Sequence, residues 1–424
     1  MRYFIYHLMK NRHSYLLFAV LFFLSCTGGN NTSENSEALA EENDQFPIHI
    51  FLEDILQKKK TDVSLSTIAS EIRYVPLETT KNSLLRRSTG SIKYLGEKYI
   101  VYGSEEVLLF DQNGKFISRV ADRGQGPQDI KEDVDYIIVD PVTNNFYVFT
   151  TGKVLKFDKM GKYIDHFRVE YDEKKFHSYQ SGVFTHNNTM ILSPSHRVVA
   201  FGETSYKVIE IDTLGRIINK YIDHSPKYVD KTKSRGGVSV SIPIYVFNNN
   251  VRFIEWGNDT IFSVTRDSMI PYAILDLGKN KMDINKLDNR GDTPLGEAIK
   301  NLTGHSVMSV QENENYIFLY FTENGLSRAG IYCLYDKKTK ELKRLNNIFT
   351  NDLDGGAPLF PISITKNEIY VGLISPEILK ELYLSKDYDE QKTKYGEHFE
   401  KAYRLAESIQ EDDNPALVIL KQKK

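Results

Sequence analysis

Short apolar runs separated by polar turns recur along most of the chain. The stretch Val107–Asp129 (VLLFDQNGKFISRVADRGQGPQD) holds two such runs, a turn at Asp111–Gly114 and a glycine-rich corner. Because asparagine and glycine tolerate positive φ, the Asn-Gly pair predicts a β-hairpin with a two-residue turn. The pattern D-x-x-G-[KR] returns at Asp158 and Asp212. Repeats of about 50 residues, each with four short strands, are typical of propeller blades.

Grouping the apolar runs by fours divides the chain into blades. Complete groups lie at residues 91–120, 134–169, 179–222, 238–277 and 306–345. A sixth group has strands at 360–365, 368–374 and 415–421, and the unassigned strand EIRYVPLE at 71–78 completes it. An N-terminal strand in the last blade removes two sheet edges that would otherwise invite aggregation. We therefore predict an all-β fold, a six-bladed β-propeller with four-stranded antiparallel blades, whose last blade is closed by an N-terminal strand.

Helical insertions are predicted near residues 279–304 and 376–413. In the first, LGEAIKNL (295–302) is a short helix candidate. In the second, apolar residues recur at helical spacing until an Asn-Pro pair ends the run, which predicts one or two helices. These helices either form a lid over one face or simply pack against the outside. Ahead of the blades, residues 46–53 predict a surface strand and residues 65–72 one helical turn.

The N-terminus carries a targeting pattern. Arg2, Lys10 and Arg12 precede the apolar run Tyr15–Leu24, which is too short for a comfortable transmembrane helix and ends just before Cys26. A small residue followed by cysteine resembles a bacterial lipoprotein signal, and simple secretion is the alternative. We predict a signal peptide at 1–25, a lipidated Cys26 with a disordered tether at 26–45, and the propeller at 46–424. The tether is acidic and lacks aromatic residues, so it cannot bury enough apolar surface to fold.

Composition supports a β-rich protein. The chain has 26 tyrosines and 23 phenylalanines against one tryptophan, and aromatic residues favour strands. The net charge of −3 comes with no basic stripe, so a nucleic-acid partner is not expected. Of the two cysteines, Cys333 lies in an apolar strand and is expected to be a buried hydrophobe. Neither a metal site nor a cofactor is predicted, because the histidines lack ligand spacing.

Candidate binding residues lie in loops expected on one face of the propeller. The corner DRGQGP (122–127) is explained by a rigid turn between blades, or it presents Arg123 and Gln125 to a ligand at the channel mouth. Several arginines at one mouth would suit an anionic ligand, and Trp256 could stack on a sugar ring or brace a blade. The histidines expected in these loops are His177, His196, His224 and His305. The candidate ligand-binding residues are Arg123, Gln125, His196, Arg197, Arg235, Trp256 and Arg328.

Several of these segments together resemble a known family. The motifs are EIRYVPLETT, LFDQNGKFISRVADRGQGPQD, FDKMGKY and the closing NPALVILK. They resemble the six-bladed β-propeller lipoproteins of Bacteroidetes, which are similar in shape to NHL-repeat propellers. The resemblance covers residue 46 to the C-terminus and implies a cell-envelope propeller. It carries over no catalytic residues.

The tether, the regular blades and the lack of a catalytic motif favour a binding or scaffold protein over an enzyme. We expect a monomer tethered to the membrane, with the outer membrane favoured, through a lipid on Cys26. The expected ligand is a glycan or another anionic small molecule at the channel mouth, or an envelope protein. A propeller enzyme acting on carbohydrate (a lyase or glycosidase) or a lactonase is one alternative. A protein–protein module of a nutrient-uptake complex is another alternative, because the propeller fold alone does not distinguish among these functions.

Overall fold

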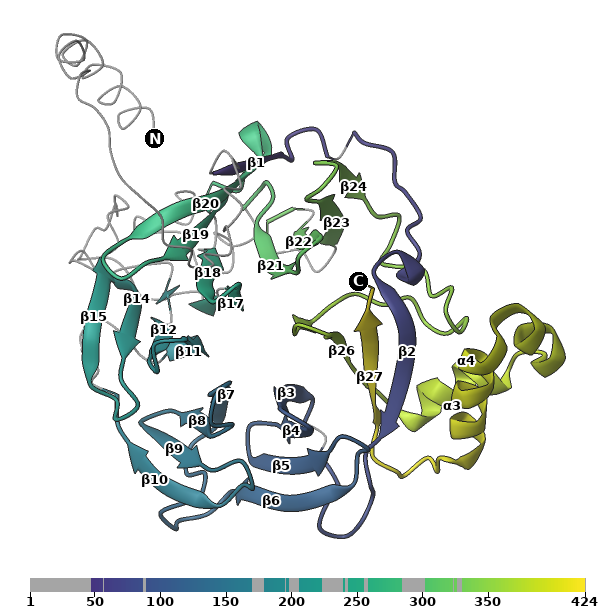
Figure 1. The fold of residues 1–424 in the computed structure, drawn as a ribbon, viewed down its shortest axis with the longest axis horizontal. Coiled ribbons are helices and arrows are strands. Elements are labelled where there is room, and N and C mark those ends of the chain that lie inside the picture. The colour runs from purple at the N-terminus through teal and green to yellow at the C-terminus, as the bar shows by residue number, and fades with distance from the viewer. Residues whose placement is uncertain are drawn as a thin grey trace, which may run out of the picture. The chain divides into compact units, whose positions relative to one another are not determined.

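Six four-stranded antiparallel sheets follow one another around a ring in the computed structural model (Figure 1). The structure describes residues 47–55, 57–86, 89–169, 179–194, 196–197, 206–222, 239–240, 243–254, 258–283, 302–322, 324–325 and 330–423. Each sheet is one blade, and consecutive blades are joined from the outer strand of one to the inner strand of the next. The predicted all-β, six-bladed propeller is therefore confirmed.

The strands of each blade are given from the inner to the outer one. Blades 1 and 2 are β3 (Ser91–Leu95), β4 (Lys98–Tyr102), β5 (Glu106–Asp111), β6 (Phe116–Asp122), then β7 (Val134–Val139), β8 (Phe146–Thr150), β9 (Lys153–Phe157), β10 (Tyr163–Phe167). Blades 3 and 4 are β11 (Tyr179–Phe184), β12 (Met190–Pro194), β14 (Tyr206–Ile211), β15 (Ile217–Ile222), then β17 (Ile244–Phe247), β18 (Asn250–Ile254), β19 (Thr260–Val264), β20 (Met269–Asp276). Blades 5 and 6 are β21 (Val307–Glu312), β22 (Tyr316–Thr322), β23 (Gly330–Asp336), β24 (Leu342–Arg344), then β25 (Ser363–Ile364), β26 (Glu368–Ile374), β27 (Ala416–Gln422), β2 (Ala69–Pro76).

The core is a ring of apolar layers between neighbouring blades. Strand β5 shows why its sequence is an unbroken apolar run. Successive side chains of a strand point to opposite faces, and here both faces are covered. Val107 and Leu109 pack in the layer shared with blade 2, whereas Leu108 and Phe110 pack in the layer shared with blade 6.

The D-x-x-G turns differ from the predicted two-residue turn. Only Gly114 has positive φ (82°), and Asp111 and Lys115 close a three-residue loop through the bond from Asp111 N to Lys115 O at 2.9 Å. The Asp111 carboxylate accepts bonds from the amides of Asn113 (2.8 Å) and Lys115 (2.9 Å). Asp158 and Asp212 accept the equivalent pairs of bonds in the next two blades. The two-residue prediction was wrong because the aspartate holds a turn that needs one left-handed residue rather than two.

The ring is closed by the N-terminal strand, as predicted. β2 pairs antiparallel with the C-terminal strand β27, from Ala69 opposite Gln422 to Pro76 opposite Ala416. Asn414, just before β27, is 2 % exposed, and its side chain binds the backbone of the segment that follows β2. Its side chain accepts from Leu85 N at 2.9 Å and donates to the carbonyls of Glu78 and Ser83. Buried polar groups need such partners, so this asparagine fixes the junction of the two termini.

Two further N-terminal features precede β2 in the chain. β1 (Ile48–Phe51) pairs parallel with β20 and so adds a fifth strand to blade 4. The predicted surface strand at 46–53 is therefore part of a sheet. The predicted helical turn at 65–72 is shorter than expected, since only Leu65–Thr67 is helical and β2 begins at Ala69.

A helical hairpin packs on the outside of blade 6. Helices α3 (Pro376–Leu384) and α4 (Tyr388–Ser408) lie beside β2 on the outer wall of the ring, away from the channel (Figure 1). The hydroxyls of Tyr74 on β2 and Tyr383 on α3 lie 2.7 Å apart. The insertion near 376–413 thus packs on the outer wall rather than acting as a lid. In the insertion near 279–304 the described residues include only the short helical turn Gly278–Asn280 and the ends of the segment, and residues 295–301 of the predicted helix lie outside them.

Within the part of the chain that the structure describes, no helix is long and apolar enough to cross a membrane. The predicted signal peptide at 1–25, Cys26 and the tether at 26–45 lie outside the described residues.

Candidate functional site

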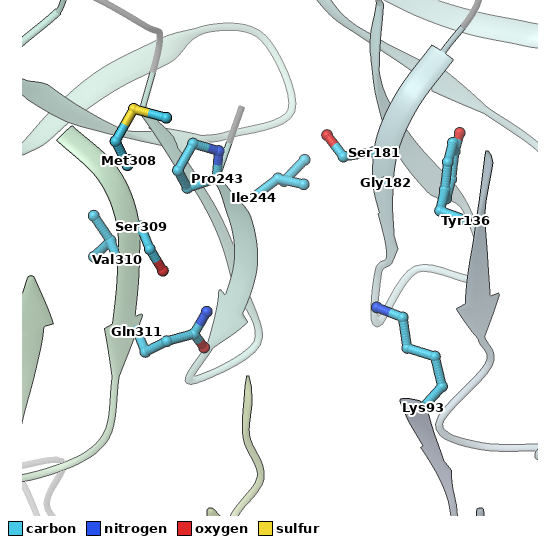
Figure 2. Close-up of a pocket in the computed structure, with 10 residues that line it drawn as sticks. All are labelled: Lys93, Tyr136, Ser181, Gly182, Pro243, Ile244, Met308, Ser309, Val310 and Gln311. Atoms are coloured by element: carbon cyan, nitrogen blue, oxygen red, sulfur yellow. The ribbon is translucent and has the colours of Figure 1, made fainter. Parts of the chain in front are cut away.

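The inner strands of five blades enclose a cavity of about 260 Å³ at the centre of the ring. Each of these strands, β3, β7, β11, β17 and β21, contributes to the lining, with Pro243 just before β17 (Figure 2). The lining residues are Lys93, Tyr136, Ser181, Gly182, Pro243, Ile244, Met308, Ser309, Val310 and Gln311.

Lys93 is the charged residue of this lining. It lies in the middle of β3 (SIKYL), and Figure 2 shows its amine extended into the open space of the channel. No described residue contacts its Nζ as a hydrogen-bond acceptor or carboxylate. The side chain keeps some solvent access through the channel, but the protein surrounds it. This burial lowers the pKa of the Lys93 amine.

The wall opposite Lys93 is formed by β21. Ser309 and Gln311 present a hydroxyl and an amide on one side of the cavity, and Met308 lies next to Pro243 at its apolar side (Figure 2). An amide and a hydroxyl can each donate and accept hydrogen bonds. With Tyr136 and Ser181 on the other side, the cavity therefore combines one cation, four polar groups of mixed hydrogen-bonding character and an apolar wall.

Gly182 on β11 is required by close packing rather than by backbone freedom. A Cβ at this position would lie 2.7 Å from Leu192 and 2.8 Å from Ile138 of the neighbouring blade. Real Cβ atoms do not approach that closely, so glycine lets β11 lie against blade 2. Its position brings that strand close to the channel axis beside Tyr136.

The side chain of Arg123 in the predicted corner is already bound by neighbouring protein groups. Its guanidinium binds Lys131 O at 3.0 Å, Glu105 at 3.2 Å and Asp133 at 2.9 Å. Asp129 accepts from Gly126 N at 2.7 Å, and a Cβ at Gly124 would lie 2.2 Å from that carboxylate. The two glycines thus allow the turn that Asp129 caps, which favours the architectural interpretation of the motif.

The other predicted site residues are placed only in part. Gln125 is exposed in the same corner and does not line the cavity. His196 and Arg197 form β13, which pairs antiparallel with β16 (Ser239–Val240). Arg235, Trp256 and Arg328 lie outside the described residues, as do His177 and His224. The ligand-binding role of this set therefore stays a prediction.

Two isolated reactive groups have ordinary structural surroundings. His305 is buried, and its Nδ1 lies 2.9 Å from the carbonyl of Thr322. Cys333 is a free, buried thiol as predicted, and burial raises its pKa to about 12. Among the described residues no group of three histidine, cysteine, aspartate or glutamate side chains is arranged to hold a metal ion.

Sequence reasoning missed Lys93 and the β21 wall because it looked for the site in loops. One signal was available in the sequence. A lysine in the centre of the predicted inner strand SIKYL is out of place in a sheet buried on both faces.

The fold and this cavity define the class of protein, a six-bladed propeller with a pocket at its axis. The chain belongs to the family described as "Domain of unknown function (DUF4934)", whose model matches residues 47–421. No curated protein matches the chain.

One solved structure from Bacteroides shares the fold, and a second has a lower similarity. An exported protein from Bacteroides fragilis is similar over 89 % of this chain and 99 % of its own, with 18 % identity and a TM-score of 0.65. A member of the DUF4221 family from Bacteroides vulgatus is similar over 86 % of this chain and 99 % of its own, with 11 % identity and a TM-score of 0.47. The predicted resemblance is thus confirmed for family and fold, whereas its lipoprotein and NHL-repeat parts stay predictions.

Proposed function

We propose that this protein is a ligand-binding propeller of the cell envelope and that the channel cavity is its binding site. One observation carries the proposal: five blades converge on a cavity of about 260 Å³ that contains an amine without a protein partner among the described residues. Ligand pockets are concave, mostly preformed and contain a few convergent polar groups. Pockets for drug-sized ligands begin at about 300 Å³, so the ligand proposed for this cavity is small.

The proposed location rests on the N-terminal pattern and on the exported relative. A charged segment, an apolar core and a cysteine at position 26 fit a lipid-anchored protein. The structurally similar protein from Bacteroides fragilis is described as exported. We propose a monomer held at the outer membrane by a lipid on Cys26, with residues 26–45 as the tether.

Mass spectrometry of the mature N-terminus tests this anchor. We expect a diacylated or triacylated cysteine at Cys26, since cleavage before Cys26 makes this residue the mature N-terminus and its thiol carries the lipid. The Cys26→Ser variant should lose the lipid and leave the membrane fraction. An unmodified N-terminus at another residue would show simple secretion instead.

Filling the cavity tests the binding site. Ser309→Phe places a ring in the channel, and we expect the affinity for any ligand found by screening sugars and organic acids to fall about tenfold or more, because the ring occupies its volume. Val142→Phe is the matched control, since Val142 is 80 % exposed in a surface loop. Calorimetric titration measures the affinities.

Arg123→Ala tests whether the ligand binds in the cavity or at the channel mouth, and its affinity is measured in the same titration. Its ion pairs are partly exposed, so the variant should lose less than about 1 kcal/mol of stability and keep full affinity. If Arg123→Ala abolishes binding while a folded Ser309→Phe keeps it, the site lies at the mouth and the cavity assignment is wrong.

A further inference from the structure

We infer that the cavity binds a small organic anion, a carboxylate of about monosaccharide size, whose charge is neutralised by Lys93. This inference rests on the proposed function and adds the chemical class of the ligand. It concerns the described residues of the channel alone.

The charge balance of the cavity is the first support. Lys93 is the charged group of the lining, and no carboxylate among the described residues approaches it. A buried charge is costly unless it is paired. A bound carboxylate would supply the missing partner through a charge-assisted hydrogen bond, which is shorter and stronger than a neutral one.

The opposite wall is the second support, because it suits a hydroxylated body rather than a plain fatty chain. The Gln311 amide and the Ser309 hydroxyl face the cavity from β21 (Figure 2). Both can donate and accept, as alternating sugar hydroxyls require. Met308, Pro243 and Ile244 give the apolar surface on which the face of a ring can lie.

The third support is that this lysine has no structural use visible in the described residues. Strand β3 packs on blade 2 and blade 6 through Leu95 and Ile92, and Lys93 contributes no described ion pair to either junction. Lys93 is half-buried in β3, so its charge is partly desolvated without a described ion pair in return. Residues that oppose local stability without structural compensation are typical of functional sites.

The test compares acids with neutral sugars of the same shape on the purified full chain. Glucuronate and galacturonate are titrated against glucose and galactose, with inorganic phosphate and sulfate as small anions. We expect each sugar acid to bind about tenfold or more tightly than its neutral counterpart. Lys93→Met should remove that preference, and Lys93→Arg should restore part of it because the charge returns.

Folding of the variants is checked independently. Because Lys93→Met removes an enclosed charge, its Tm should stay unchanged or rise by about 2 °C. Loss of binding with a native or higher Tm therefore reports the site and not the fold. A Tm that falls strongly would mean that Lys93 has a structural role, and this would overturn the inference.

The pH dependence gives a readout that a purely steric role would not change. The carboxylate binds the protonated amine, so affinity falls as pH rises through the lowered pKa of Lys93. On the neighbouring strand β7, Tyr136 lines the cavity and Asp135 precedes it in the sequence. Burial together with Asp133 raises the pKa of Asp135 to about 6. Titrations between about pH 7 and 10 lie above that transition and isolate the amine. A wild-type affinity profile that matches that of Lys93→Met at every pH would contradict the role of Lys93.

The outcomes separate this inference from the proposed function. If glucose and galactose bind as tightly as their acids, and Ser309→Phe still abolishes binding, the anion inference fails and the channel site stands. If none of the probes binds wild type, both fail. A trimer of galacturonate identifies the source of the ligand. If the trimer binds with the same affinity as galacturonate, the ligand is a free acid. If the trimer binds more tightly, the ligand is the end of an acidic glycan.

Discussion

Gly114→Ala is expected to lower the free energy of unfolding by about 3 kcal/mol, because it combines backbone strain with a clash against another blade. Gly114 has a φ of 82°, which an alanine adopts only with strain. Its Cβ would also lie 2.0 Å from the carbonyl oxygen of Pro76 in β2. That atom belongs to the backbone of the strand that closes the ring, so it cannot move aside alone.

The same contact is held by hydrogen bonds that the alanine would disturb. Gly114 O accepts from Glu78 N at 2.8 Å, and the Glu78 carboxylate accepts from Phe116 N at 2.7 Å. These two bonds join the end of β2 to the turn between β5 and β6. Gly114 therefore lies at the junction of blade 6 with blade 1, where the two ends of the propeller meet.

Gly161→Ala is the matched control, because Gly161 occupies the same place in blade 2. Its φ of 78° gives a similar backbone strain. Its nearest neighbours are side-chain atoms, Val120 Cγ2 at 2.8 Å and Ser118 Oγ at 3.1 Å. These can rotate, so we expect a loss of only about 1–2 kcal/mol. Chemical denaturation measures both variants. Equal losses would show that φ alone matters and that the contact with Pro76 adds nothing.

The fold was predictable because its pattern is local and repeated. Each blade requires four short strands joined by tight turns, and these are visible in the order of apolar and polar residues. Closure by β2 followed from counting strands, since one blade lacked its outer member. The turn type was not predictable from the Asn-Gly pair, because the choice depends on the Asp111 carboxylate and on the room that Pro76 leaves for Gly114.

The candidate site was less predictable than the fold. Whether residue 93 or residue 92 faces the axis depends on the phase of an inner strand, and a shift by one residue exchanges the two faces. Ile92 packs between blades 6 and 1, whereas Lys93 lines the cavity. The loop arginines were predicted as ligand-binding residues because charged residues in loops are easy to recognise in a sequence. Arg123 shows the limit of that approach, since its guanidinium already binds Glu105 and Asp133.

Glu312 at the end of β21 is the second position where a large effect is expected. It is fully buried between blades 4 and 5. Its carboxylate accepts hydrogen bonds from Tyr245 at 2.9 Å and Tyr272 at 2.5 Å and pairs with Lys337 at 2.7 Å. Burial raises the pKa of Tyr245 well above its usual value and the Glu312 carboxylate adds to this shift, so the phenol stays a donor.

Glu312→Ala should cost about 3–5 kcal/mol, because it leaves two phenol groups without their acceptor and the Lys337 ammonium without its charge partner. Lys337→Met is the informative partner variant. The carboxylate keeps both phenol bonds, and a methionine can still pack on Phe247, which the Lys337 amine now covers at 3.9 Å from the ring centroid. We expect a smaller loss, of about 1–3 kcal/mol, because the carboxylate and the Asn313 carbonyl lose the ammonium while the two phenol donors remain. Equal losses for the two variants would mean that the ion pair, and not the phenol network, holds this junction.

The same pair of variants links stability to the binding site. Glu312 directly follows Gln311, which forms the wall opposite Lys93. Loosening the end of β21 should therefore weaken ligand binding in Glu312→Ala even at temperatures where the chain is still folded. Lys337→Met should bind as wild type, because the phenol bonds still fix the strand end. Calorimetric titration well below the Tm of each variant measures this difference. If Glu312→Ala binds with full affinity when folded, the buried network stabilises the blades without positioning the cavity wall.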